Sequence, residues 1–263
     1  IAPKARLAYH DPDIETPMPP LSHALLLLFL FGVANATRAE SLDHILACNA
    51  EALGGERAFA QIDNLRIQLD IAEPGFEVTA TYVASRAGLM RIDVMAGDER
   101  VFAEGLDEAG AWQWTPDAGV TRSSAAAAAT LRHGVEAPGR FSTLRHLQLR
   151  GARVEWLQPG PLARPEEWQL QLTRDDGTQT DHFLARASCL PTREVSRRAF
   201  HPDVDATEVL IETVHSAPAE IDGVLRFQRG ESRSLATGEW LGTTQIRGME
   251  HNVELPDRFF EAR

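Results

Sequence analysis

The chain has 263 residues, of which 43% are hydrophobic and 24% are charged, and its 38 Asp and Glu against 26 Lys and Arg give a formal net charge of -12. Nucleic acids and anionic membrane surfaces are bound largely through basic clusters that neutralise negative charge. An acidic chain without such a cluster therefore argues against a function in binding DNA, RNA or anionic lipid surfaces.

The first feature along the chain is an uncharged apolar run over residues 24–36, which ends on Ala34-Asn35-Ala36, a small-x-small pattern of the kind that signal peptidase cuts. The run is too short to cross a hydrocarbon layer about 30 Å thick, which takes about 20 apolar residues. We therefore expect residues 1–39 to be an upstream extension plus a cleaved signal peptide, in preference to a membrane anchor. Residues 40–263 would then form a single exported domain.

The start of translation is left open by the sequence. Met18 is a candidate start, and on that hypothesis residues 1–17 are upstream sequence or a disordered extension without a structural role. Cleavage after Ala39 fits the same small-residue rule as cleavage after Ala36.

The exported part holds the two cysteines of the chain, Cys48 and Cys189. Because export delivers them to an oxidising compartment, a single disulfide is the favoured interpretation. Two alternatives concern Cys48: residues 45–48 loosely resemble a lipid-attachment motif, and His44 lies four residues away and could share a metal with it. Charged residues separate the apolar run from Cys48, and no second ligand pair has metal spacing, so both alternatives are less favoured.

Residues 41–60 have the spacing of helices. Apolar residues recur at steps of three and four and are interrupted by Gly54-Gly55, which predicts a helix, a glycine break and a short second helix. Ser41 is a suitable N-cap.

After Asn64 the apolar period changes to two, which predicts strands. Residues 65–71 and 76–82 alternate on either side of Pro74-Gly75 and so predict an antiparallel hairpin. Similar segments follow at residues 90–94, 100–105, 111–115, 154–157, 168–172, 182–184, 192–200, 208–215, 224–234 and 239–250. The total of about ten to twelve short strands predicts a mainly antiparallel β fold of the sandwich or barrel kind.

An alanine run at residues 125–129 interrupts the strands. Alanine is the best helix former, so we predict a helix over about Ser124 to Val135, with a flexible linker as the alternative. Leu131 and Val135 lie four residues apart, which favours a helix that covers something.

The sequence contains no Gly-x-Ser-x-Gly, His-Glu-x-x-His, Cys-x-x-Cys or glycine-rich phosphate loop. We therefore predict neither an enzyme nor a cofactor or metal site. The prominent feature is instead a set of apolar residues on the strand faces, which would form either a plain sandwich core or the lining of a pocket in a curved sheet. These ligand-binding candidates are Leu65, Ile67, Leu69, Phe76, Val78, Tyr82, Met90, Ile92, Trp112 and Trp114.

Three segments carry a resemblance to a known family. Residues 51–66, the strand end at residues 112–116 and the closing stretch at residues 252–260 resemble periplasmic proteins of the outer-membrane lipoprotein-sorting type, the lipoprotein carrier superfamily. The resemblance implies a curved, incomplete antiparallel barrel whose helices cover an apolar, acyl-binding concave face.

The same resemblance implies a function. It indicates a periplasmic carrier that holds a lipid or the acyl chain of a lipoprotein, with an inner- or outer-membrane protein as a possible partner, and we expect a monomer. The helix near residues 125–135 is a hypothetical lid, for which Ala127, Leu131 and Val135 are the candidate residues. The alternative is a regulatory interaction protein that senses lipid or misfolded protein in the cell envelope.

Overall fold

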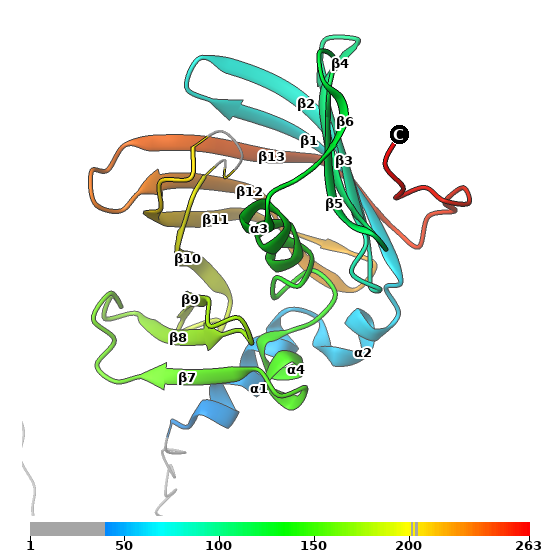
Figure 1. Cartoon of the computed structure of the whole chain (residues 1–263). Coiled ribbons are helices and arrows are strands. Elements are labelled where there is room, and N and C mark those ends of the chain that lie inside the picture. Colours follow the sequence, from blue (N-terminus) through cyan, green and yellow to red (C-terminus); the bar gives the residue numbers. More distant parts are fainter. Residues whose placement is uncertain (1–39, 201, 203–204) are drawn as a thin grey trace, which may run out of the picture. The chain divides into compact units, whose positions relative to one another are not determined.

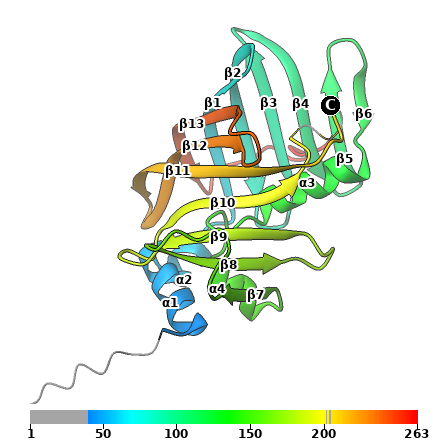
Figure 2. The ribbon, with the colours of Figure 1, turned by 90° about the vertical axis from the view of Figure 1, so that its left-hand side faces the viewer.

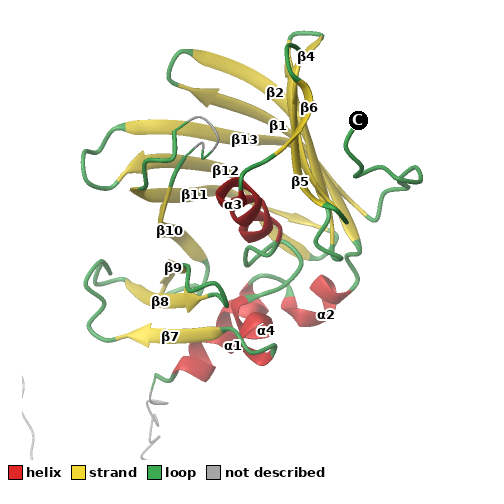
Figure 3. Cartoon of the chain, in the orientation of Figure 1, coloured by secondary structure: helices red, strands yellow, loops and turns green. Residues whose placement is uncertain are grey.

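The computed structural model describes residues 40–200, 202 and 205–263. The predicted signal peptide, its predicted cleavage site and the candidate start at Met18 lie outside the described residues. The described part holds 13 strands and four helices (Figure 1), coloured by type in Figure 3. The helices are α1 (Leu42–Ala52), α2 (Gly55–Ala60), α3 (Ala125–Val135) and α4 (Leu144–Leu149). None of these helices is long and apolar enough to cross a membrane.

The first two helices have the predicted form. The Ser41 side chain accepts a hydrogen bond from the His44 backbone amide at 3.2 Å and so caps α1. Gly54 separates the helices with a φ of 108°, and a Cβ at this position would collide with the carbonyl oxygen of Gly223. Since the Leu225 amide also donates to the Leu53 carbonyl at 3.0 Å, the glycine break places the helices against the turn at residues 222–223.

All strands belong to one antiparallel sheet. In chain order they are β1 (Asn64–Glu73), β2 (Phe76–Ser85), β3 (Met90–Ala96), β4 (Glu99–Asp107), β5 (Gly110–Thr115), β6 (Gly119–Arg122), β7 (Arg153–Leu157), β8 (Glu167–Thr173), β9 (Gln179–Ala185), β10 (Pro191–Arg198), β11 (Val209–Ile221), β12 (Val224–Ser234) and β13 (Trp240–His251). The spatial order is β6-β5-β4-β3-β2-β1-β13-β12-β11-β10-β9-β8-β7. The predicted hairpin is β1–β2, with Glu73 opposite Phe76.

The sheet is curved and does not close. Figure 2 shows the strands following one another from β7 to β6, the two ends of the sheet order. In Figure 1 the sheet bends around α3, while α1, α2 and α4 lie together beside the lower strands. The prediction of an incomplete barrel with helices on its concave side is confirmed.

Two apolar clusters fill the space between the helices and the sheet. The first joins Leu53 and Phe59 to the inner side chains of β1 to β5. The second joins Ile45 and Leu46 of α1 and Leu144 of α4 to β7, β8 and β9. The helix α4, which sequence reasoning missed, is only six residues long and is capped by Thr143, so its pattern was too short to stand out.

The predicted disulfide is present between Cys48 and Cys189, whose Cα atoms are 5.8 Å apart. It ties α1 to the turn between β9 and β10, and the Asn49 amide supports it by donating to the Cys189 carbonyl at 2.9 Å. Because the Cys48 sulfur is in the disulfide, lipid attachment or metal binding at this residue is excluded in this state. Among the described residues no cluster of three or more His, Cys, Asp or Glu has the arrangement of a metal site.

Candidate ligand-binding concave face

Strand register assigns every side chain of the sheet to one of two faces, because residues directly opposite each other share a face. Starting from Leu65, the opposite residues are Ala84, Met90, Leu106 and Ala111 on successive strands from β2 to β5. These residues form one cluster with Val135 of α3 and with Phe141. We call this side, which carries α3, the concave face, and the opposite side the convex face.

The apolar half of the concave face, formed by β1 to β4, is covered at one end only. Leu65, Ile67, Tyr82 and Met90 are buried against the helices. Towards the β1–β2 turn, in contrast, the inner side chains other than Ala80 remain partly or fully exposed, and four of the partly exposed ones are not members of either core cluster. These four partly exposed residues of the concave face are Ile71, Val78, Val94 and Phe102. An apolar strip therefore continues beyond the part that the protein's own helices fill.

The structure brings eight of the ten predicted ligand-binding residues to this face. Leu65, Ile67, Leu69, Val78, Tyr82, Met90 and Ile92 follow one another in register. Phe76 has the same orientation, but it lies at the tip of the hairpin and is 47% exposed.

The prediction is wrong in placing Trp112 and Trp114 with this set, since the structure places both on the convex face. Ala111, not Trp112, is opposite the inner residue Leu106, so both tryptophans point the other way. Gly105 lies opposite Trp112, and a Cβ there would be 2.7 Å from the indole ring, which shows how closely the ring packs. The Trp112 indole N–H donates to the Phe260 carbonyl at 3.1 Å, so this tryptophan anchors the C-terminal segment.

The helix α3 lies where the sequence predicted a lid. Ser124 caps it, and Ala127 and Val135 are buried with Leu131 half-buried between them. The alanine run is therefore helical and packs near β4 and β5, and the linker alternative is excluded.

A polar contact joins the far end of α3 to the other half of the sheet. His133 Nε2 lies 2.8 Å from Asp176 Oδ2 in the β8–β9 turn. Burial and the nearby Arg174 charge lower the pKa of His133, against the opposing effect of Asp176. The pKa of Asp176 falls to about 2, mainly because the Thr178 backbone amide donates to it. The helix thus bridges the two halves of the curved sheet.

The second half of the concave face, formed by β9 to β12, is polar. His182 is opposite Leu170 on one side and Glu194 on the other, and Glu194 is opposite Thr213. The Thr213 and Ser232 hydroxyls hydrogen-bond at 3.0 Å. This polar half carries no apolar run. The sequence analysis missed it because strand faces were recognised by their alternating apolar residues, and the inward-facing residues here are polar.

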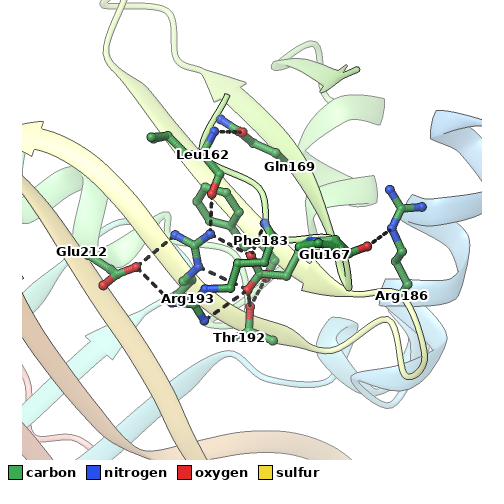
Figure 4. Close-up of polar contacts among 10 residues, drawn as sticks. Leu162, Glu167, Gln169, Phe183, Arg186, Thr192, Arg193 and Glu212 are labelled. Atoms are coloured by element: carbon green, nitrogen blue, oxygen red, sulfur yellow. Dashed lines mark hydrogen bonds and ion pairs between the residues drawn. The ribbon is translucent and has the colours of Figure 1, made fainter. Parts of the chain in front are cut away.

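Behind the polar half, the convex face of β8 to β10 holds a buried charge cluster (Figure 4). Arg193 is 4% exposed and binds Glu167 through Nη2 at 2.7 Å and Nε at 3.2 Å. Its Nη1 donates to Glu212 at 3.0 Å, and Nη2 also donates to the Leu162 carbonyl at 2.7 Å. The guanidinium carbon lies 3.6 Å from the centre of the Phe183 ring. Because all three guanidinium nitrogens of Arg193 donate within the protein, the cluster is a structural support rather than a binding site.

Two grooves have charged side chains in their linings, and the first also includes Ile71 and Val78 at the end of the apolar strip. One, of about 490 Å³, includes Asp70, Glu77, Arg229 and Arg247 in its lining. The other, of about 720 Å³, lies along the C-terminal segment at residues 255–262. The charged linings make both grooves poor sites for an acyl chain.

The similarity of this chain to known proteins lies in its three-dimensional structure. No protein-family model matches the chain, and no curated protein matches it in sequence. A solved LolA superfamily protein from Nitrosomonas europaea is similar, with a TM-score of 0.53 at 14% identity over 85% of this chain and 98% of that chain. The chain has the fold of the LolA superfamily.

Two further solved structures agree with this fold. A DUF1329 family protein from Desulfovibrio piger has a TM-score of 0.50 at 12% identity, over 82% of this chain and 97% of that chain. A domain described as an outer membrane lipoprotein-sorting protein, from Vibrio parahaemolyticus, also has a TM-score of 0.50 at 12% identity, over 80% and 95%. The LolA-superfamily fold expected from the sequence resemblance is confirmed, while identities this low show the fold alone.

Proposed function

We propose that this protein is a periplasmic carrier that binds the acyl chain of a lipid or of a lipoprotein on the apolar half of its concave face. The observation that carries the proposal is the partly exposed apolar strip of β1 to β4, which continues past the residues packed against the helices. Binding and release would need no catalytic residue.

The energetics suit reversible binding. Burial of an acyl chain of about 16 carbons yields on the order of 12 kcal/mol, at about 0.8 kcal/mol per methylene. Association costs of about 4–15 kcal/mol offset much of this gain. One chain on an open concave face would therefore load and unload, as transport requires.

Native mass spectrometry of protein purified without detergent tests the proposal directly. We expect a retained lipid, whose mass would identify the cargo. Absence of any acyl ligand, together with a stoichiometric protein partner recovered from envelope extract, would favour a regulatory interaction protein instead.

A substitution in the apolar strip makes the test specific. Val94 is partly exposed on the concave face, so Val94→Gln places an amide against the acyl chain, at a cost of about 1–3 kcal/mol if it is left unpaired. We expect about a tenfold or greater loss of affinity for a fluorescent fatty acid. The control is Thr81→Gln, on the neighbouring strand but exposed on the convex face. Equal affinity in the two variants would contradict binding at the strip.

A second pair of variants tests the lid. Ala127 is 6% exposed in α3, so Ala127→Trp would force the helix away from the sheet. We expect altered uptake and release rates of the fluorescent fatty acid in stopped-flow measurements. Ala126→Trp, one residue earlier and exposed, is the matched control. Unchanged rates in Ala127→Trp would count against a lid.

A further inference from the structure

Two partly buried arginines, Arg174 and Arg198, lie on the polar half of the concave face. Arg174 Nη1 donates to the hydroxyl of Thr180 at 3.0 Å, and Thr180 is opposite the inner residue Leu172. Arg198 follows Glu194 at an even spacing in β10 and so shares its face. Both guanidinium groups therefore belong to the side of the sheet that carries α3.

Neither arginine has an ion-pair partner within the described residues, where no carboxylate oxygen comes within 4.0 Å of either guanidinium. The charge of Glu194 acts on both arginines, and its carboxylate lies 3.8 Å from His182 Nδ1. Asp176, whose charge acts on Arg174 less strongly than that of Glu194, is held by His133 and by the Thr178 amide. The contrast with Arg193, which binds two carboxylates on the convex face, indicates that these two arginines are available to an added anion.

A buried histidine beside them has an unused polar atom. His182 is 7% exposed, and its Nε2 is buried without a hydrogen-bond partner among the described residues. Burial is the main reason that the pKa of His182 falls to about 4, so the ring is neutral at pH 7. An unpaired buried ring nitrogen is unfavourable, and in the tautomer that carries its proton on Nε2 the ring could donate to an anionic group of a ligand.

We infer that the polar half is a headgroup subsite, and that the ligand is an amphiphile whose anionic group, a carboxylate or a phosphate, lies among Arg174, Arg198 and His182. Its acyl chain would lie over the apolar half, so the inference rests on the proposed function and adds an orientation to it. Hydrogen bonds from guanidinium groups to such anions are among the strongest in proteins. In a chain with a net charge of -12, these unpaired cations would also select where an anionic ligand binds.

The test compares Arg198→Gln with Arg197→Gln, the next residue, which is exposed and points to the convex face. Both variants lose one positive charge from the same strand. Three ligands with the same acyl chain are titrated by calorimetry: palmitate, palmitoyl-lysophosphatidylglycerol and uncharged monopalmitin. We expect Arg198→Gln to bind at least one anionic ligand about tenfold more weakly and monopalmitin unchanged, with Arg197→Gln like the parent protein.

The pattern of results separates the two proposals. A loss for palmitate only would assign the site to a carboxylate, and a loss for the lysophospholipid would assign it to a phosphate. Equal binding of charged and uncharged ligands, unaffected by Arg198→Gln or by the second variant Arg174→Gln, would overturn the headgroup subsite and leave acyl binding intact. Displacement of palmitate by millimolar inorganic phosphate, with monopalmitin still bound, would show a free-anion site and also overturn it. Failure of all three ligands to bind would overturn both proposals.

Discussion

Reduction of the Cys48–Cys189 disulfide is expected to lower the free energy of unfolding by as much as about 5 kcal/mol, the value that chain entropy gives for a loop of this length. The two cysteines are 141 residues apart in sequence, so the bond removes a large part of the freedom of the unfolded chain. In the folded state it holds α1, which contributes Ile45 and Leu46 to the second apolar cluster, against the β9–β10 turn.

Urea unfolding with and without a thiol reductant measures this effect. The control is the double variant Cys48→Ala/Cys189→Ala, whose midpoint should be low and should not respond to the reductant. An unchanged midpoint for the parent protein after complete reduction would show that the bond contributes nothing to stability.

Replacement of Arg193 by methionine is expected to cost about 3–5 kcal/mol, because it leaves a buried carboxylate without its partner. Glu167 is 2% exposed and receives two hydrogen bonds from Arg193. Arg153→Met is the control, since the Arg153–Glu155 pair is largely exposed and such pairs contribute about 0–1 kcal/mol. The double variant Arg193→Met/Glu167→Gln removes the unpaired charge and should recover part of the loss.

The effect of pH on this variant follows from Glu167. Burial alone would raise the pKa of the Glu167 carboxyl, but hydrogen bonds from Arg193, Thr192 and the Arg164 amide hold it below its ordinary value of 4.5. The cluster therefore stabilises the fold above about pH 4.5, and this stabilisation is lost as the pH falls through the lowered pKa. The stability difference between the parent protein and Arg193→Met should shrink under these acidic conditions. A difference that stays constant down to pH 3 would contradict the assignment.

Local sequence patterns were sufficient to predict several helices and strands and the disulfide. Ser41, the glycine pair and the spacing of apolar residues predicted α1 and α2, and Pro74-Gly75 predicted the β1–β2 hairpin. The alanine run predicted α3, and the two cysteines, in a chain expected to be exported, predicted their bond. In each case the signal lies within a few residues or in composition, so no knowledge of distant contacts was needed.

Which face of each strand turns inward could be decided only from the tertiary structure. A period of two shows that a strand has two faces, but it does not show which one turns inward. Trp112 and Trp114 alternate as regularly as Ile92 and Val94, yet the pairing of β4 with β5 turns the tryptophans outward, where the C-terminal segment covers Trp112. That segment lies more than a hundred residues further along the chain, and no local pattern indicates it.

The sequence by itself determined the class of the protein, namely a mainly antiparallel β chain with a short helical start, an internal helix and one disulfide. Only the tertiary structure decided the pairing of β1 with β13, which joins the two halves of the sheet, and the division of the concave face into an apolar and a polar half. The physical reason is that elements arise from interactions between near neighbours in the chain, whereas faces, clefts and buried charge clusters arise from pairings between strands that are far apart in sequence.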